Sequence, residues 1–185
     1  MATKHGYAAI RRQRGVTLIE LIMVLVIVSV LTCLCVPSLR GMLARQRLRA
    51  AQMDLISGLQ NARTTAIVRD ARVVLCPTRD GLQCSEESRW DSGWLIGIDR
   101  NYDNQPDDRP LYVNLHDAKS LAIRSSAGRH AVIFQPDGMA SGSNVAISIC
   151  DPGVRGQVLS VVVSNAGRIR GADANATQIA NCLGG

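Results

Sequence analysis

The stretch that decides the fold is residues 14–20, which read Arg-Gly-Val-Thr-Leu-Ile-Glu. It opens a mostly apolar segment over 16–36, interrupted by two threonines, one serine and Glu20. As a helix rising about 1.5 Å per residue, this segment would extend roughly 30 Å, the thickness of a bilayer's hydrocarbon core. The sequence therefore predicts a transmembrane helix over 16–36.

Residues 1–15 form a short leader that has no acidic side chain and carries four basic ones: Lys4, Arg11, Arg12 and Arg14. Basic segments stay on the cytoplasmic side, so the remainder of the chain should cross the membrane. A secretory signal would end its apolar region at an A-x-A-like cleavage site, and residues 34–38 match that pattern poorly. Processing is therefore expected before the apolar segment.

The leader ending in Gly15, followed by Val-Thr-Leu-Ile-Glu and an apolar run, resembles the N-terminus of the type IV prepilin family. The resemblance implies cleavage between Gly15 and Val16 by a prepilin peptidase, with methylation of the new amine. Phe is commoner in the family at the position of Val16. Pro37 falls where the family places a helix-kinking proline.

Glu20 is a carboxylate in an apolar segment, which costs about 2.5–3.5 kcal/mol at the centre of a membrane helix. It lies four residues, about one helical turn, after Val16. In a bundle of such helices, Glu20 could pair with the α-ammonium of a neighbouring Val16 and set the axial register. The alternative is a glutamate that merely reaches the membrane interface.

The formal net charge of +6 invites a nucleic-acid interpretation of the whole chain. Four of the 21 basic residues lie in the leader, however, so 17 basic residues would face 15 acidic ones after cleavage. A nucleic-acid interface must therefore depend on a local basic patch.

Residues 37–72 continue the helical pattern. Apolar residues recur there at three- to four-residue spacing on one face: Leu48, Leu55, Leu59, Ala62 and Ala66. Pro37 and Gly41 would bend or soften the junction. We therefore expect one long helix, with its first half in lipid or a filament core and its second half on a globular head. A nearby basic cluster should contact lipid head groups or neighbouring subunits: Arg40, Arg45, Arg47 and Arg49.

After residue 72 the pattern changes to short strands separated by Gly, Pro, Asn and Asp, at 72–76, 94–99, 111–115, 131–134, 145–150 and 158–163. Short strands joined by turns favour an antiparallel sheet, so the sequence predicts an α+β protein. Its expected divisions are a leader (1–15), a transmembrane or filament-core helix (16–36), an amphipathic helix (37–72) and a β-rich head (73–185). Trp90 and Trp94 should anchor the core.

Segments of the head, at 90–94, 98–101, 133–138, 145–150 and 164–170, resemble the FimT/GspH branch of the pilin superfamily. Together with the N-terminal motif, this resemblance covers most of the chain. It implies the type IV pilin fold, a long N-terminal helix packed on an antiparallel sheet.

Four cysteines lie in the polar part of the chain: Cys76, Cys84, Cys150 and Cys182. In a small exported domain they suggest two disulfides. Sequence order favours Cys76–Cys84 and Cys150–Cys182, although three pairings exist. Free buried thiols in a cytoplasmic protein are one alternative, and zinc is another, although no CxxC pair or suitably spaced histidine is present.

No set of residues indicates catalysis. His5 belongs to the leader, and neither His116 nor His130 has a sequence neighbour that suggests a triad or a metal site. The sequence therefore predicts neither a cofactor nor enzymatic activity.

A partial calcium-loop pattern occupies positions 1, 3, 5 and 9 with Asp99, Asn101, Asp103 and Asp107. Asn104 takes the place of the glycine, however, and Pro110 that of the bidentate glutamate. We therefore interpret this segment as an acidic turn.

The segment Gly167-Arg168-Ile169-Arg170-Gly171 is the most distinctive local feature of the head. In an extended chain Arg168 and Arg170 would point to one side, about 6.6 Å apart, while Ile169 faces the sheet. Two guanidinium groups at that spacing can bind neighbouring phosphates, and the flanking glycines would allow close backbone approach. Arg155 and Arg124 could extend the patch.

This segment resembles the G-R-x-R motif of FimT-type minor pilins, which bind DNA during natural transformation. The resemblance carries DNA binding over to Gly167, Arg168 and Arg170. The alternatives are that both arginines are solvated, hold the C-terminal tail by salt bridges or contact the next filament subunit. Two to four phosphate contacts would give non-specific binding with a salt slope of about −2 to −4.

These features predict a minor type IV pilin that is incorporated at or near the pilus tip and supports assembly. Its expected partners are other major and minor pilins, the prepilin peptidase, the inner membrane and non-specific double-stranded DNA taken up in transformation. The leader should be cytoplasmic and the head periplasmic, then extracellular after assembly. The alternatives are a GspH-like minor pseudopilin of a type II secretion system and, with no catalytic set to support it, an unrelated membrane-anchored enzyme.

Overall fold

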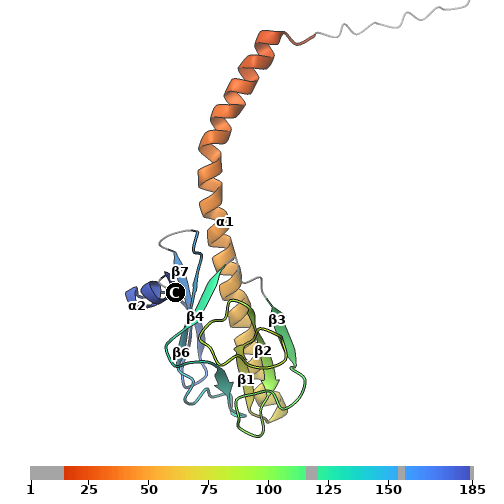
Figure 1. Ribbon diagram of the computed structural model, residues 1–185, viewed down its shortest axis with the longest axis vertical. Helices are drawn as coiled ribbons and strands as arrows, with labels where there is room; N and C mark the ends of the chain where they lie inside the picture. Colours follow the sequence, from red (N-terminus) through yellow and green to blue (C-terminus); the bar gives the residue numbers. More distant parts are fainter. Residues whose placement is uncertain (1–14, 116–120, 154–156, 184–185) are drawn as a thin grey trace, which may run out of the picture. The chain divides into compact units, whose positions relative to one another are not determined.

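The computed structural model describes residues 15–115, 121–153 and 157–183, without the side chains of 34–40 (Figure 1). It comprises two compact units, Met1–Arg40 and Gly41–Gly185. One helix, α1 (Leu18–Arg69), runs through both units. The prediction of a single long helix is therefore confirmed.

Helix α1 ends three residues before the predicted boundary at 72. Asp70 adopts a left-handed conformation with a φ of 46°. The amide of Ala71 donates to the carbonyl of Ala66 and that of Asp70 to Ile67, which is the pattern of a Schellman cap. The chain then enters the first strand directly.

Among the described residues, no helix combines the length and the apolar character needed to cross a membrane, so the span expected over 16–36 is not confirmed.

The head contains two antiparallel sheets. The first has the order β3-β2-β1-β5 and is built from β1 (Val73–Pro77), β2 (Gly93–Ile98), β3 (Tyr112–Leu115) and β5 (Val132–Phe134). The second has the order β4-β6-β7-β8 and is built from β4 (Ala122–Ser125), β6 (Val145–Cys150), β7 (Val158–Val163) and β8 (Ile169–Asp173). The expected α+β class with an antiparallel head is therefore confirmed.

All six predicted strands are present, with bounds that differ by one residue at most. Strands β4 and β8 were not predicted because each carries arginine, and β8 also contains Gly171, which weakens the strand pattern. Helix α2 (Ala176–Leu183) was also missed. Its signal is a reciprocal cap, in which the side chains of Asn175 and Gln178 each accept the other's backbone amide at 2.9 and 2.8 Å.

One hydrophobic core joins α1 to both sheets. The predicted stripe on α1, from Leu48 to Ala66, is at most 2% exposed at its five positions. Trp90 and Trp94 are 1% and 2% exposed and belong to the same cluster. The second half of α1 is therefore the central element of the head, beside which both sheets lie (Figure 1).

The structure forms two disulfides, Cys76–Cys84 and Cys150–Cys182, which are the pairings that sequence order favours. The first closes the loop that follows β1. The second attaches α2 to β6, so that the C-terminal helix covers that end of the second sheet. The free-thiol and zinc alternatives do not apply to these four cysteines.

Gly58 tests how closely α1 approaches the first sheet. A Cβ at this position would lie 2.7 and 2.8 Å from two ring atoms of Trp94, whereas nothing lies within 4 Å of a Cβ at Gly41. Inside a helix, glycine to alanine ordinarily stabilises by about 1 kcal/mol. We expect Gly58→Ala to destabilise the full chain in non-ionic detergent by about 1–3 kcal/mol through overpacking. Urea unfolding should show no such loss for Gly41→Ala, and equal behaviour of the two variants would contradict this packing.

The two disulfides should contribute unequally to stability. Their half-cystines are 32 and 8 residues apart, and loop entropy predicts contributions of about 3.7 kcal/mol for Cys150–Cys182 and about 2.5 kcal/mol for Cys76–Cys84. Paired Cys→Ser variants, unfolded with urea under oxidising conditions, provide the measurement. A larger loss for the Cys76–Cys84 pair would show that native-state contacts outweigh loop entropy.

Candidate functional site

The residues proposed for processing and assembly lie at the start of α1. Gly15 and Val16 are exposed and precede the helix. The hydroxyl of Thr17 accepts the backbone N–H of Glu20 at 3.4 Å, and Glu20 is the third residue of the helix. Thr-x-x-Glu is the spacing of a capping box, and an acid at this position complements the helix dipole. Glu20 therefore has a local role in starting α1 while its side chain remains exposed.

The Gly-Arg-Ile-Arg segment forms the turn between β7 and β8 and the start of β8. The amide of Gly167 donates to the carbonyl of Ser164 at 2.8 Å, and the amide of Ser164 donates to the carbonyl of Arg168 at 3.0 Å. Gly167 has a φ of 72°, so this is a three-residue hairpin loop that closes with a left-handed residue. The turn therefore fixes the backbone at Arg168 and directs the chain into β8, which contains Arg170.

Both arginine side chains are exposed, and Ile169 between them is half-buried against the main core. This is the alternation that the sequence predicts. Strand β8 is an edge strand of the second sheet; Arg170 lies on it, and Arg168 immediately precedes it. Among the described residues, neither guanidinium has a hydrogen bond or an ion pair. The alternative in which salt bridges to the described residues hold the C-terminal tail is therefore not supported.

Gly167 itself is buried, and its lack of a side chain allows the close packing of the turn. A Cβ there would overlap the carbonyl oxygen of Gly138 and lie 3.1 Å from Nε of Arg63. The same Nε donates to that carbonyl at 2.9 Å. Gly171 likewise faces the side chain of Gln52 on α1. Both glycines therefore bring the hairpin close to α1.

Of the two arginines that could extend the patch, Arg124 is described by the structure, and it does not join Arg168 and Arg170. Arg124 lies on β4, at the opposite edge of the same sheet. Its guanidinium pairs with the buried carboxylate of Asp91, which also accepts the amide of Ile123 at 2.6 Å. The role of Arg124 is therefore to hold the loop before β2 against β4. Arg155 and His116 lie outside the described residues.

Arg63 is a residue of this surface that sequence reasoning missed. It projects from α1 and, together with Arg168, lines a hollow of about 530 Å³ beside the turn. In the sequence Arg63 directly follows Ala62, which belongs to the buried stripe of α1. No sequence signal indicates which part of the head Arg63 contacts. Its proximity to the turn depends on tertiary structure alone.

The segment with the partial calcium-loop pattern is held together by the side chain of Arg72. Asp99 is fully buried and forms an ion pair with Arg72, whose second terminal nitrogen donates to Asn104 at 2.8 Å. The Arg72 guanidinium also stacks 4.9 Å from the ring centre of Tyr102. Among the described residues, no group of three or more histidine, cysteine, aspartate or glutamate side chains is placed to hold a metal. The loop is thus an acidic turn built around Arg72.

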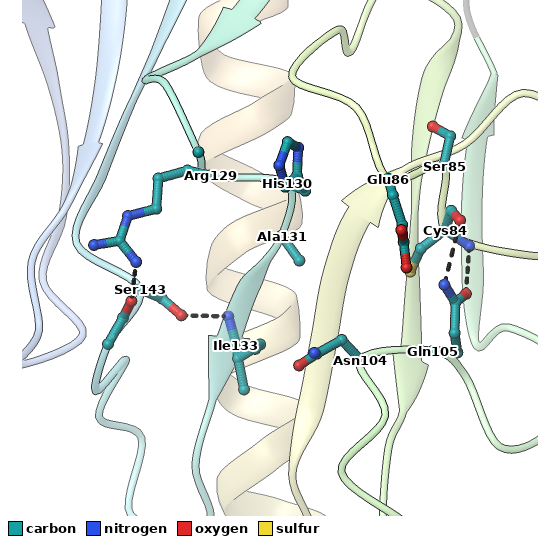
Figure 2. A pocket seen from close by; sticks show the side chains of 12 residues that line it. Cys84, Ser85, Glu86, Asn104, Gln105, Arg129, His130, Ala131, Ile133 and Ser143 are labelled. Atoms are coloured by element: carbon teal, nitrogen blue, oxygen red, sulfur yellow. Dashed lines mark hydrogen bonds between the residues drawn. The ribbon is translucent and has the colours of Figure 1, made fainter.

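A second hollow, of about 430 Å³, lies between the disulfide loop and β5 (Figure 2). On one side the side chain of Gln105 bonds both backbone groups of Cys84, at 2.8 and 3.3 Å. On the other side the hydroxyl of Ser143 accepts the amide of Ile133 at 3.1 Å (Figure 2). These polar groups hold backbone in place, and no nucleophile among the described lining residues is paired with a base.

Hydrogen bonds in and beside the disulfide loop lower the pKa of two carboxyl groups. Two hydrogen bonds from Arg79, at 2.8 and 2.7 Å, hold the pKa of Glu87 below its usual value. The backbone amides of Leu82 and Gln83 lower the pKa of Asp80. Both groups stay ionised at neutral pH and order the loop, so they are structural rather than poised for acid–base chemistry.

Known protein families and solved structures that resemble this chain are consistent with the observed fold. Residues 51–167 match the family model described as type II transport protein GspH, which is more than half of the 185-residue chain. Residues 10–32 match the prokaryotic N-terminal methylation motif. The first match ends at Gly167, so Arg168 and Arg170 lie just beyond it.

A curated relative is the pilin-like protein PilA1 of Thermus thermophilus, which is 30% identical over 165 residues, covering 85% of this chain and 97% of the relative. Two crystal structures of the type IV minor pilin FimU from Pseudomonas aeruginosa PAO1 are also similar. Their TM-scores are 0.56 and 0.55, at 22% and 21% identity, and they cover 68% of this chain and 88% and 92% of theirs. At these identities the similarity to FimU shows a shared fold. The family-model match, which covers more than half of the chain, shows that the chain belongs to the family described as type II transport protein GspH, and it has the type IV pilin fold.

Proposed function

We propose that this chain is a minor type IV pilin whose head binds the DNA backbone without sequence preference. The observation that carries the DNA proposal is the pair of exposed guanidinium groups of Arg168, in the β7–β8 turn, and Arg170, on the edge strand β8. Arginine binds phosphate through a planar group with several donors and a fixed charge. Because neither group is paired within the described residues, no internal ion pair has to be broken for a phosphate to bind.

Maturation and membrane insertion complete the proposal. Cleavage after Gly15 would remove the leader, expose the amine of Val16 for methylation and leave 16–36 as the membrane and filament-core helix. Residues 37–72 would continue that helix into a periplasmic head over 73–185. The exposure of Gly15 and Val16, immediately before α1, is compatible with access by a prepilin peptidase.

A minor pseudopilin of a type II secretion system is the second candidate. The description of the matched family, a type II transport protein, favours it. Both candidates share the fold and the N-terminal helix, so the genes beside this one are the observation that separates them. Pilus genes would support the first candidate and secretion genes the second.

Glu20 provides the test of assembly. Glu20→Gln removes the charge that would pair with the amine of a neighbouring Val16, while it keeps a side chain that can complete the helix cap. We expect its incorporation into sheared filaments, measured by immunoblot, to fall at least tenfold while the level in the membrane is unchanged. Thr17→Ala, which removes the cap but keeps the charge, is the control. Normal incorporation of the glutamine variant would contradict the pairing.

Arg168 and Arg170 provide the test of DNA binding. We expect the double variant Arg168→Ala/Arg170→Ala to weaken binding of labelled double-stranded DNA at least tenfold, because two charge-assisted phosphate contacts are lost. Fluorescence anisotropy on the full chain in non-ionic detergent is the measurement. Arg69→Ala/Arg109→Ala removes the same charge from two other exposed positions and should bind nearly as wild type does. If both double variants lost DNA affinity equally, the effect would come from overall charge and not from a site at Arg168 and Arg170.

A further inference from the structure

The hollow beside the β7–β8 turn is lined by donors and contains no acid among its described lining residues. These are Gln60, Arg63, Thr64, Ala166, Arg168 and Ile169. Gln60, Arg63 and Thr64 follow i, i+3 and i+4 spacing, which places them on one face of α1. Arg168 comes from the turn. The side chains of two arginines, one glutamine and one threonine can all donate hydrogen bonds, and no carboxylate in this lining neutralises the two charges.

The orientation of Arg63 is fixed by the fold. The Nε of Arg63 donates to the carbonyl of Gly138 at 2.9 Å, and the Arg63 side chain is half-buried. A guanidinium has five N–H donors, so four remain after this bond. Among the described residues, those four have no partner. The bond to Gly138 therefore holds the group in one place and leaves its two terminal nitrogens for another acceptor.

The charges also favour an anion in this hollow. Arg63 and Arg168 line the same space, and two like charges in one hollow repel each other unless an anion lies between them. A phosphate oxygen can accept from both guanidinium groups at once, and the amide of Gln60 and the hydroxyl of Thr64 can complete its shell. A half-buried site strengthens such contacts relative to a fully exposed lysine or arginine.

From these observations we infer that the hollow between α1 and the β7–β8 turn binds one backbone phosphate of DNA, and that Arg63 is a direct phosphate ligand together with Arg168. This inference rests on the proposed function and extends it. Arg170, farther along β8, would contact a neighbouring phosphate. The DNA path would then start at α1 and continue along the edge of the second sheet.

The test measures DNA affinity and its salt dependence for Arg63→Gln and Arg63→Lys in the full chain in non-ionic detergent. Loss of one phosphate contact lowers the slope of log K against log salt by about 0.9. We expect Arg63→Gln to show that change and to bind about tenfold more weakly at about 50 mM salt. Arg63→Lys keeps the charge but not the bond from Nε, so it should retain the wild-type slope.

The matched control is Arg47→Gln, which removes the same charge from an exposed position on the same helix, about 24 Å away along its axis. Wild-type affinity and slope are expected for it. If Arg63→Gln binds as Arg47→Gln does, the inference is wrong while the proposed function stands. If the lysine and glutamine variants lose slope equally, Arg63 positions the turn and does not contact phosphate, which also overturns the inference.

Two further outcomes separate the remaining possibilities. If the wild-type chain binds no DNA, the proposed function fails together with the inference. Inorganic phosphate, titrated by calorimetry, should show no saturable binding below about 10 mM, because a single phosphate lacks the neighbouring contact at Arg170. Tight phosphate binding that Arg63→Gln abolishes, with DNA affinity unchanged, would assign the hollow to a free anion and overturn the inference.

Discussion

Burial of one face of α1 against both sheets is the contact on which the head depends. Five apolar positions from Leu48 to Ala66 are nearly inaccessible and join the two sheets into one core. The chain has one phenylalanine and two tryptophans, so large aromatic side chains contribute little of the core volume. Alanine and glycine on the helix compensate by close approach, as at Gly58 beneath the ring of Trp94. The helix thereby fixes where both sheets lie in the head.

Buried ion pairs hold two loops that lie outside the sheets. Asp99 and Asp91 are buried carboxylates, each held by an arginine, namely Arg72 and Arg124. Removing one partner of such a pair leaves an uncompensated buried charge, which is strongly unfavourable. In these pairs Arg72 and Arg124 are themselves largely buried, with side chains 10% and 15% exposed. Arg124 and Arg72 are structural, whereas Arg63, Arg168 and Arg170 are the arginines that we propose to contact phosphate.

The turn between β7 and β8 connects the core to the proposed function. Gly167 can lie against the carbonyl of Gly138 because it has no side chain, and its positive φ suits glycine. Arg63 binds the same carbonyl, so α1, the Gly138 turn and the Gly167 turn meet at one point. The backbone at Arg168 is therefore held next to the helix by the packing of Gly167. Such preorganisation reduces the entropy lost when a phosphate binds.

The sequence by itself determined the long helix, its buried stripe, six strands and the favoured cysteine pairs. These features have a local signature, because periodicity and turn residues report how neighbouring side chains are exposed. Only the tertiary structure decided that Arg124 lies at the far edge of its sheet, that Arg72 takes the place of a cation beside Asp99, and that Arg63 meets Arg168. Each of these depends on residues far apart in the chain, and no local pattern specifies which of them will approach. The shared core around α1 brings them together.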